Sequence, residues 1–176
     1  MTRVRRNCYD RILGMNPYSK FIEGKDPMTV LAATPQRLRE LAAGLTGSQL
    51  QAHPVPGKWS IHENVAHLAD SELMFSARCR YILYEENKPL IGFDQDKMMA
   101  GWRREQESFE DTLERFRVMR QALVRMFRAA SPHDLERTGI HDEYGPESAS
   151  EYMFKVAGHD LNHLEQLVRL RQLLAG

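Results

Sequence analysis

The sequence is short of the features that mark secreted and membrane proteins. It contains two cysteines, Cys8 and Cys79, which are too few for a disulfide framework in a chain of 176 residues. No run of apolar residues approaches the length of a signal-peptide core or of a membrane span. We therefore expect no membrane association, and a reducing cytoplasm is the simplest location for the protein.

The sequence also lacks net charge. Its 24 basic and 24 acidic residues give a formal charge of zero at pH 7, whereas a protein that binds nucleic acid needs a basic surface to neutralise phosphates. We therefore expect no nucleic-acid partner. A chain of 176 residues suffices for one hydrophobic core but hardly for two. We predict an irregular N-terminal segment, residues 1–30, whose first 14 residues add little stability, followed by one domain, residues 31–176.

Alternation of apolar and polar residues over the length of a strand is absent as well, and the periodicity is helical. A short helix is predicted to begin at Thr34, with Pro35 in its first position, and to end at Gly44. Longer helices are predicted over residues 60–86, over residues 94–130 with a break near Gly101, and over residues 148–174, and residues 133–146 are predicted to form a loop. Such helices can bury their apolar faces only against one another, which predicts an all-α four-helix bundle.

Two histidines four residues apart, His159 and His163, are the most informative feature that the sequence contains. On an α-helix this spacing places them roughly 40° apart, on the same face as Val156 and Leu167. Imidazole nitrogens that point into a core need partners, because a buried polar atom without a hydrogen bond is costly. Ordinary hydrogen bonds would satisfy them, and a divalent metal ion is the alternative.

A third histidine, His67, lies on another predicted helix, two turns after a capping box formed by Ser60 and Glu63. It stands at the margin of the apolar stripe of that helix. A border position of this kind suits a ligand that faces a cleft.

The segments that carry these histidines, Trp59 to Glu72 and Gly158 to Leu167, resemble the DinB-like superfamily, in particular its branch of metal-dependent hydrolases and low-molecular-weight-thiol transferases. The resemblance implies a homodimer of four-helix bundles with up-down-down-up topology. It also implies that one histidine of the second helix and two of the last helix bind a divalent metal ion. In this sequence those residues are His67, His159 and His163.

Three neutral imidazoles would leave the double charge of the metal uncompensated and some coordination positions open, which is typical of catalytic sites. Water bound to zinc in such a site ionises at about pH 7 and can hydrolyse a substrate, whereas a bound thiol would become a thiolate that attacks an electrophile. Nitrogen ligands suit zinc or nickel first, with iron or copper as alternatives.

The resemblance slightly favours an enzyme that transfers a low-molecular-weight thiol, as co-substrate, to a small-molecule electrophile. The alternatives are a metal-dependent hydrolase and a non-catalytic stress-response protein that binds metal. An intact set of three histidines favours an enzyme over the non-catalytic role.

Four further residues are weaker candidates for the site. Glu63 could transfer a proton in catalysis, although its capping role explains it, and Gln166 could orient a ligand or make an interhelical hydrogen bond. Tyr152 could contact the substrate, although a core position with its hydroxyl at the rim explains it as well. His141, which precedes the last helix, could close over the cleft in three dimensions.

Overall fold

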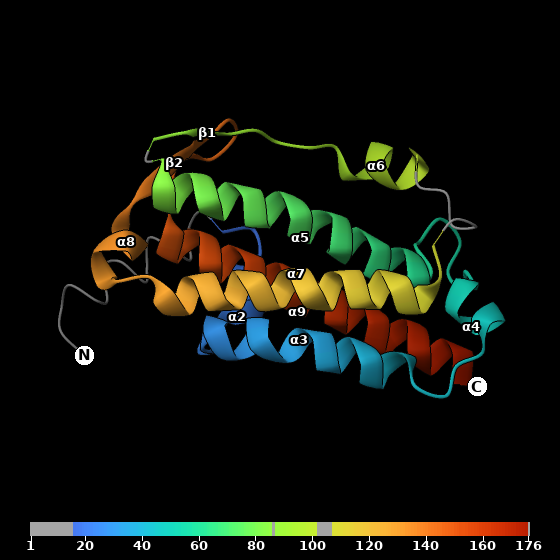
Figure 1. The fold of residues 1–176 in the computed structure, drawn as a ribbon. Coiled ribbons are helices and arrows are strands. Elements are labelled where there is room, and N and C mark those ends of the chain that lie inside the picture. Colours follow the sequence, from blue (N-terminus) through green and yellow to red (C-terminus); the bar gives the residue numbers. More distant parts are fainter. Residues whose placement is uncertain (1–15, 86, 102–106, 176) are drawn as a thin grey trace.

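Four long amphipathic helices build the protein, which is described by a computed structural model over residues 16–85, 87–101 and 107–175. The helices are α3 (Pro27–Ala42), α5 (Ile61–Tyr84), α7 (Phe109–Ala129) and α9 (Ala149–Ala175) (Figure 1). Helix α5 packs against α7 and α9, and α3 packs against the same two helices. The predicted four-helix bundle is therefore confirmed.

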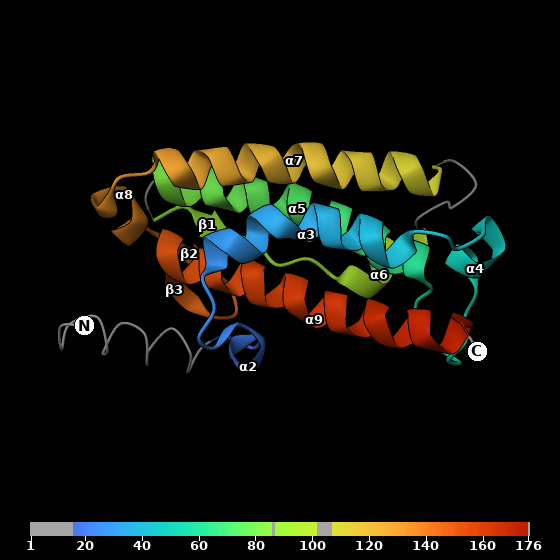
Figure 2. The same ribbon diagram turned by 90° about the horizontal axis from the view of Figure 1, so that it is seen from below.

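The helices follow the up-down-down-up order. Helices α5 and α7 run in the same direction, and α3 and α9 run in the opposite direction (Figures 1 and 2). Because α5 and α7 are parallel, the chain between them must return along the length of the bundle. This crossover carries strand β1 (Pro89–Leu90) at one end of the bundle and helix α6 (Gln95–Gly101) towards the other.

The prediction that the chain has no strands is wrong. Strand β2 (Thr138–His141) pairs with β3 (Gly145–Ser148) in an antiparallel hairpin, and β1 pairs with β2 in parallel. Strands of two to four residues are too short to show an alternating pattern. The predicted loop over residues 133–146 thus contains most of the short helix α8 (Pro132–Glu136) and much of this hairpin.

Capping chemistry predicts two helix starts correctly and one wrongly. The capping boxes of Ser60 with Glu63 and of Ser148 with Glu151 are both formed. Helix α3, however, begins at Pro27 rather than near Thr34, because Asp26 caps it and Pro35 lies inside the helix. A proline in a helix leaves a carbonyl without its donor four residues earlier.

A guanidinium from another helix compensates for this missing donor. Arg120 on α7 donates to the carbonyl oxygen of Leu31, four residues before Pro35, at 3.4 Å. The proline is therefore tolerated through a tertiary contact. No local pattern in the sequence predicts such a contact.

The predicted irregular segment, residues 1–30, is partly regular. Residues 1–15 lie outside the described part of the chain, so the prediction about the first 14 residues is not addressed. Helix α2 (Ser19–Ile22) follows, and it contacts α9. Its Ile22 is fully buried in the core, which shows that α2 packs on the bundle.

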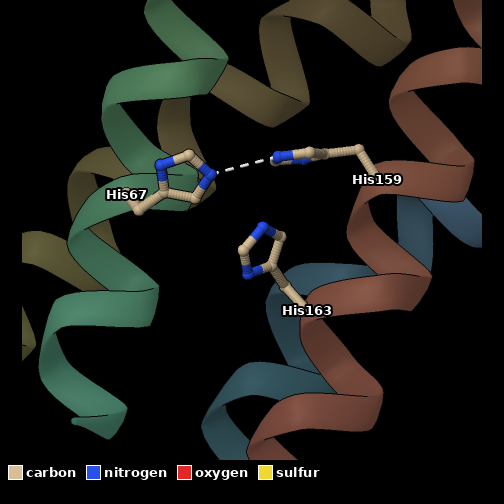
Figure 3. A group of neighbouring side chains, drawn as sticks. All are labelled: His67, His159 and His163. Atoms are coloured by element: carbon tan, nitrogen blue, oxygen red, sulfur yellow. Dashed lines mark hydrogen bonds between the residues drawn. The ribbon is translucent and has the colours of Figure 1, made fainter. Parts of the chain in front are cut away.

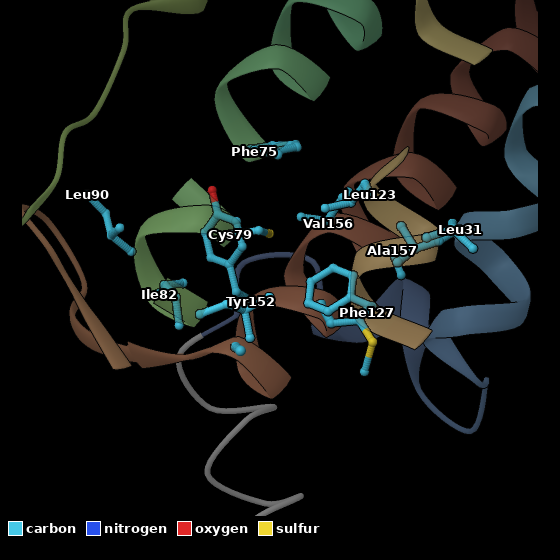
Figure 4. Packing of buried hydrophobic residues seen from close by; sticks show 14 of the residues in the cluster. Leu31, Phe75, Cys79, Ile82, Leu90, Leu123, Phe127, Tyr152, Val156 and Ala157 are labelled. Atoms are coloured by element: carbon cyan, nitrogen blue, oxygen red, sulfur yellow. The ribbon is translucent and has the colours of Figure 1, made fainter. Parts of the chain in front are cut away.

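The hydrophobic core fills the bundle in two clusters along its length. One cluster gathers Phe75, Cys79, Tyr152 and their neighbours at the end nearest the small sheet (Figure 4). The other lies around Leu68, Phe116 and Leu167. The short helices α4 (Gly47–Gln51) and α8, at the ends of the bundle, have no buried residue. No helix in the described ranges is long and apolar enough to cross a membrane.

A buried polar network joins the four long helices at mid-bundle. The guanidinium of Arg120 forms ion pairs with Glu72 and Asp160, and the hydroxyl of Thr34 donates to Asp160 at 2.7 Å. Arg120 is 1% exposed, and the two carboxylates are fully buried. The network fixes α9 at the residue that follows His159.

Candidate metal centre

Three histidine side chains converge in the groove between α5 and α9. His67 projects from α5, and His159 and His163 project from successive turns of α9 towards it (Figure 3). One ring nitrogen of each histidine lies within 4.8 Å of the corresponding nitrogens of the other two. The structure therefore brings together the three residues that the sequence singles out.

The three imidazoles are neutral because they are buried. Burial lowers the pKa of His67 to about 4 and that of His163 to about 3. Burial also places the pKa of His159 well below its usual value, and His163 and His67 add to this effect. A neutral imidazole keeps a lone pair on one ring nitrogen, which is the form that binds a metal ion.

Asn64 fixes which nitrogen of His163 is free. The amide group of Asn64 donates to the carbonyl oxygen of Ser60 at 2.9 Å, which leaves its oxygen to accept a hydrogen bond from Nδ1 of His163 at 3.1 Å. The proton of His163 is thereby held on Nδ1 and the lone pair on Nε2. Such hydrogen bonds from a neighbouring shell orient the ligands of metal sites.

Aromatic side chains enclose the histidine cluster. Trp59 lies 4.8 Å from His67 and stacks on His163 at 6.3 Å, measured between ring centroids. The edges of Tyr18 and Phe75 face His159, each at 5.2 Å. These contacts restrict the three rings and keep water away from them.

A glycine allows Tyr18 to reach the cluster. Gly158 precedes His159 on α9, and a Cβ atom at this position would lie 2.7 Å from the Cβ of Tyr18 and 2.9 Å from its carbonyl oxygen. Only glycine permits so close an approach without displacing the backbone. The segment from residue 16 to residue 22 therefore forms one wall of the site.

The donor set fits a divalent metal ion. The Nε2 atoms of His67 and His159 face each other at 3.1 Å, and Nδ1 of His159 is buried without a hydrogen-bond partner. Neutral imidazoles that converge through Nε2 leave lone-pair capacity unused at these atoms, and a cation would satisfy it. With Nε2 of His159 bound in this way, its Nδ1 would carry the proton of that ring. The cluster contains no carboxylate, so an ion held there would keep its double charge.

A cavity of ≈ 160 Å³ adjoins the cluster. His67 and His159 line it, together with Phe75 and Phe93 as an apolar wall. His141 also lines it and accepts hydrogen bonds from two backbone N–H groups at Nδ1, which leaves its proton on Nε2. His141, a sequence candidate for this site, therefore lies at the wall of the cavity.

The other three sequence candidates lie farther from this cavity. Glu63 accepts from the backbone of Ser60 in its capping role. Gln166 lines a different cavity, of ≈ 640 Å³, which includes Trp59 but none of the three histidines. Tyr152 is fully buried, and it does not line the smaller cavity. Its hydroxyl lies in the core rather than at the rim. There it accepts a hydrogen bond from Arg78 at 3.3 Å.

Sequence reasoning missed several residues that surround the cluster. Asn64 stands one turn before His67, and a buried asparagine within a helix is a weak signal of a hydrogen-bonding role. Arg78 and Lys155 line the smaller cavity, although charged side chains on helices ordinarily face solvent. Their burial depends on the crossover and the small sheet, which periodicity does not place.

Acid should destabilise the metal-free protein strongly. The pKa values of the three histidines are lower in the folded chain than the usual value of about 6.5, so below that pH the unfolded chain binds protons that the folded chain does not. Each histidine then removes about 1.4 kcal/mol of stability per pH unit until the pH reaches its folded pKa. Denaturant titrations of chelator-treated protein between about pH 7 and about pH 5 measure this loss. Equal unfolding midpoints at both ends of that range would contradict it.

The chain is similar to known proteins over most of its length. A family model, the DinB superfamily, matches residues 31–167. Two proteins of Oceanobacillus iheyensis are similar in sequence. "Putative metal-dependent hydrolase OB0782" is 27% identical over 136 residues, which are 77% of this chain and 78% of the relative. "Putative metal-dependent hydrolase OB0413" is 25% identical over 134 residues, which are 74% and 75% of the two chains.

One solved structure shares the fold. YfiT from Bacillus subtilis, described as "a probable metal-dependent hydrolase with an unusual four-helix bundle topology", matches with a TM-score of 0.75 and 20% identity. The match covers 83% of this chain and 84% of YfiT. At this level of identity the likeness concerns the fold.

Proposed function

The chain belongs to the DinB superfamily, and we propose that it is a metal-dependent hydrolase of small molecules, with a divalent ion held by His67, His159 and His163. The observation that carries the proposal is the convergence of three buried, neutral imidazoles, two of which, those of His67 and His159, line a cavity. The names of the two Oceanobacillus relatives agree with this activity.

The residues of the chain prepare the site in three ways. Asn64 orients His163, the rings of Trp59 and Tyr18 exclude water, and the cavity beside His67 and His159 admits a small substrate. A divalent ion bound by neutral nitrogens supplies Lewis acidity, which lowers the pKa of a bound water or thiol and polarises a substrate carbonyl. Zinc and nickel are the metals that we expect first.

Metal dependence of hydrolysis tests the proposal. Protein purified without an affinity tag is analysed for metal and then assayed on a panel of small esters and amides, before and after treatment with a chelator. We expect hydrolysis that disappears with the metal and returns when zinc or nickel is restored. Bound metal without hydrolysis of any panel member would instead favour the non-catalytic metal-binding role.

Transfer of a low-molecular-weight thiol is the second candidate. Cys79, the cysteine within the described residues, is 1% exposed, and burial raises the pKa of its thiol well above the usual value. A thiol reaction at the cavity would therefore need a thiol co-substrate. Metal-dependent conjugation of a small thiol to an electrophile, without hydrolysis, would favour this candidate.

The predicted homodimer stays a prediction.

A further inference from the structure

The cavity beside the histidine cluster is lined by a buried cation, Arg78, which forms no ion pair with a carboxylate within the described part of the chain. We propose that Arg78, with Lys155 beside it, binds a carboxylate group of the substrate and so directs the rest of the molecule towards the histidines. This inference rests on the proposed function only in that the substrate enters the cavity of ≈ 160 Å³ lined by both cations and by His67 and His159.

Arg78 is 6% exposed, and its hydrogen-bond partners are neutral. Its guanidinium donates to the carbonyl oxygen of Ile91 and to the hydroxyl of Tyr152, and its Nε is buried without a partner. Within the described ranges no carboxylate forms an ion pair with it. A buried charge is ordinarily paired, because removing an ion from water is costly. Arg78 therefore has both a charge and donors to offer to a ligand.

Lys155 differs from Arg78 in that its charge is already balanced. Its ammonium group forms an ion pair with Glu147 and lies 3.9 Å from the centre of the Tyr144 ring. Among the buried charged groups at the cavity, Arg78, Lys155 and Glu147 leave one positive charge in excess. The carboxylate of Glu143 also lines the cavity, but it is exposed to solvent and forms no ion pair with Arg78 among the described residues. That excess matches the single negative charge of a carboxylate, and the planar fork of an arginine suits the two oxygens of this group.

The surroundings hold Arg78 in position before a ligand arrives. Its contact with Ile91 ties it to the crossover, and its contact with Tyr152 ties it to α9. Tyr152, which the sequence offered as a substrate-binding candidate, thus acts as a positioning residue for Arg78. Phe75 and Phe93 supply an apolar wall, so the cavity suits a small organic acid with a short hydrocarbon part.

Small probes distinguish charge recognition from general binding. Propionate, its neutral analogue propionamide and inorganic phosphate are titrated into metal-free and metal-loaded protein, with calorimetry and the unfolding temperature as readouts. We expect propionate to bind and stabilise both forms, and propionamide to do neither. Equal binding of propionate and propionamide would overturn the proposal, and tighter binding of phosphate than of propionate would overturn its assignment to a carboxylate.

Two variants at neighbouring arginines supply the matched comparison. Arg78→Met is expected to weaken propionate binding by about 10- to 100-fold, because charge-assisted hydrogen bonds are lost. Its unfolding temperature should not decrease, since the substitution removes an unbalanced buried charge. Arg80→Met, at an exposed arginine that bonds the carbonyl of Ser76 in its own helix, should leave propionate binding unchanged.

Two outcomes would count against the proposal. Unchanged propionate affinity in Arg78→Met, with a lower unfolding temperature, would make Arg78 a purely structural residue. If Arg78→Met does not fold, Arg78→Lys is used, which keeps the charge and should bind propionate more weakly than the wild type. Binding of propionate to metal-loaded protein alone, with no effect of either Arg78 variant, would assign the carboxylate to the metal.

The proposal for the metal site and the proposal for the carboxylate site can be refuted independently of each other. A His163→Ala variant that lacks metal should still bind propionate through Arg78. Retention of propionate binding in a wild-type protein that proves to hold no metal would refute the proposed function and leave this inference intact.

Discussion

Changing His163 to alanine is expected to remove most of the bound metal and, with it, the hydrolytic activity. Only His67 and His159 would remain in the cluster, so the site would lose its third nitrogen. Loss of a group that hydrogen-bonds to a metal ligand typically costs about 10- to 100-fold in metal affinity. We therefore expect removal of a ligand to cost more than about 100-fold. Metal analysis after dialysis against a chelator measures the loss.

Two further variants calibrate this result. His133→Ala should retain the metal, because His133 is exposed on the short helix α8. Asn64→Ala should weaken metal binding by about 10- to 100-fold, because it removes the acceptor that holds the His163 proton on Nδ1. Full metal occupancy in His163→Ala would show that the proposed ligand set is wrong, and His141 or Glu63 would become the next candidate.

The three histidines could be predicted from the sequence because their signal is local. A spacing of four residues places His159 and His163 on one face of α9, and a capping box fixes where α5 begins relative to His67. The helix faces then follow from periodicity, and the resemblance to the DinB-like superfamily, confirmed by the family match, pairs the two helices. For these reasons the four-helix fold and the histidine cluster could be predicted from the sequence.

Arg78 could not be predicted in the same way. It stands two residues before Arg80 on α5, and the sequence around the two gives no sign that one is buried and the other exposed. The difference arises because the crossover brings Ile91 and Phe93 over one side of the helix. Pro35 is a similar case, since its place inside α3 depends on Arg120, 85 residues later in the chain.

The largest effect on stability is expected from Arg120→Met. This change would leave the carboxylates of Glu72 and Asp160 buried without a cation, and breaking a buried ion pair by removing one partner costs about 3–5 kcal/mol. It would also remove the donor to the carbonyl of Leu31 that Pro35 leaves free. For a chain of this size the loss corresponds to a decrease of about 6–20 °C in the unfolding temperature, which calorimetry measures.

Arg117→Met is the matched control. Arg117 lies one turn before Arg120 on α7 and pairs with Glu114 at the surface, where ion pairs contribute at most about 1 kcal/mol. We expect this variant to unfold close to the wild-type temperature. A similar decrease in both variants would mean that α7 tolerates no shortening of its arginines, whatever their burial.

The pH dependence separates unpaired charge from lost packing in Arg120→Met. Burial already raises the pKa of Glu72 in the wild type, where Arg120 opposes the effect, so without Arg120 that pKa must rise further. A carboxyl group with a raised pKa in the folded state costs stability at neutral pH, and the cost disappears as the group is protonated at lower pH. The difference in unfolding free energy between wild type and variant should therefore shrink from about pH 7 to about pH 5. A difference that stays constant over this range would assign the effect to packing around Phe116 and Leu31 rather than to the two carboxylates.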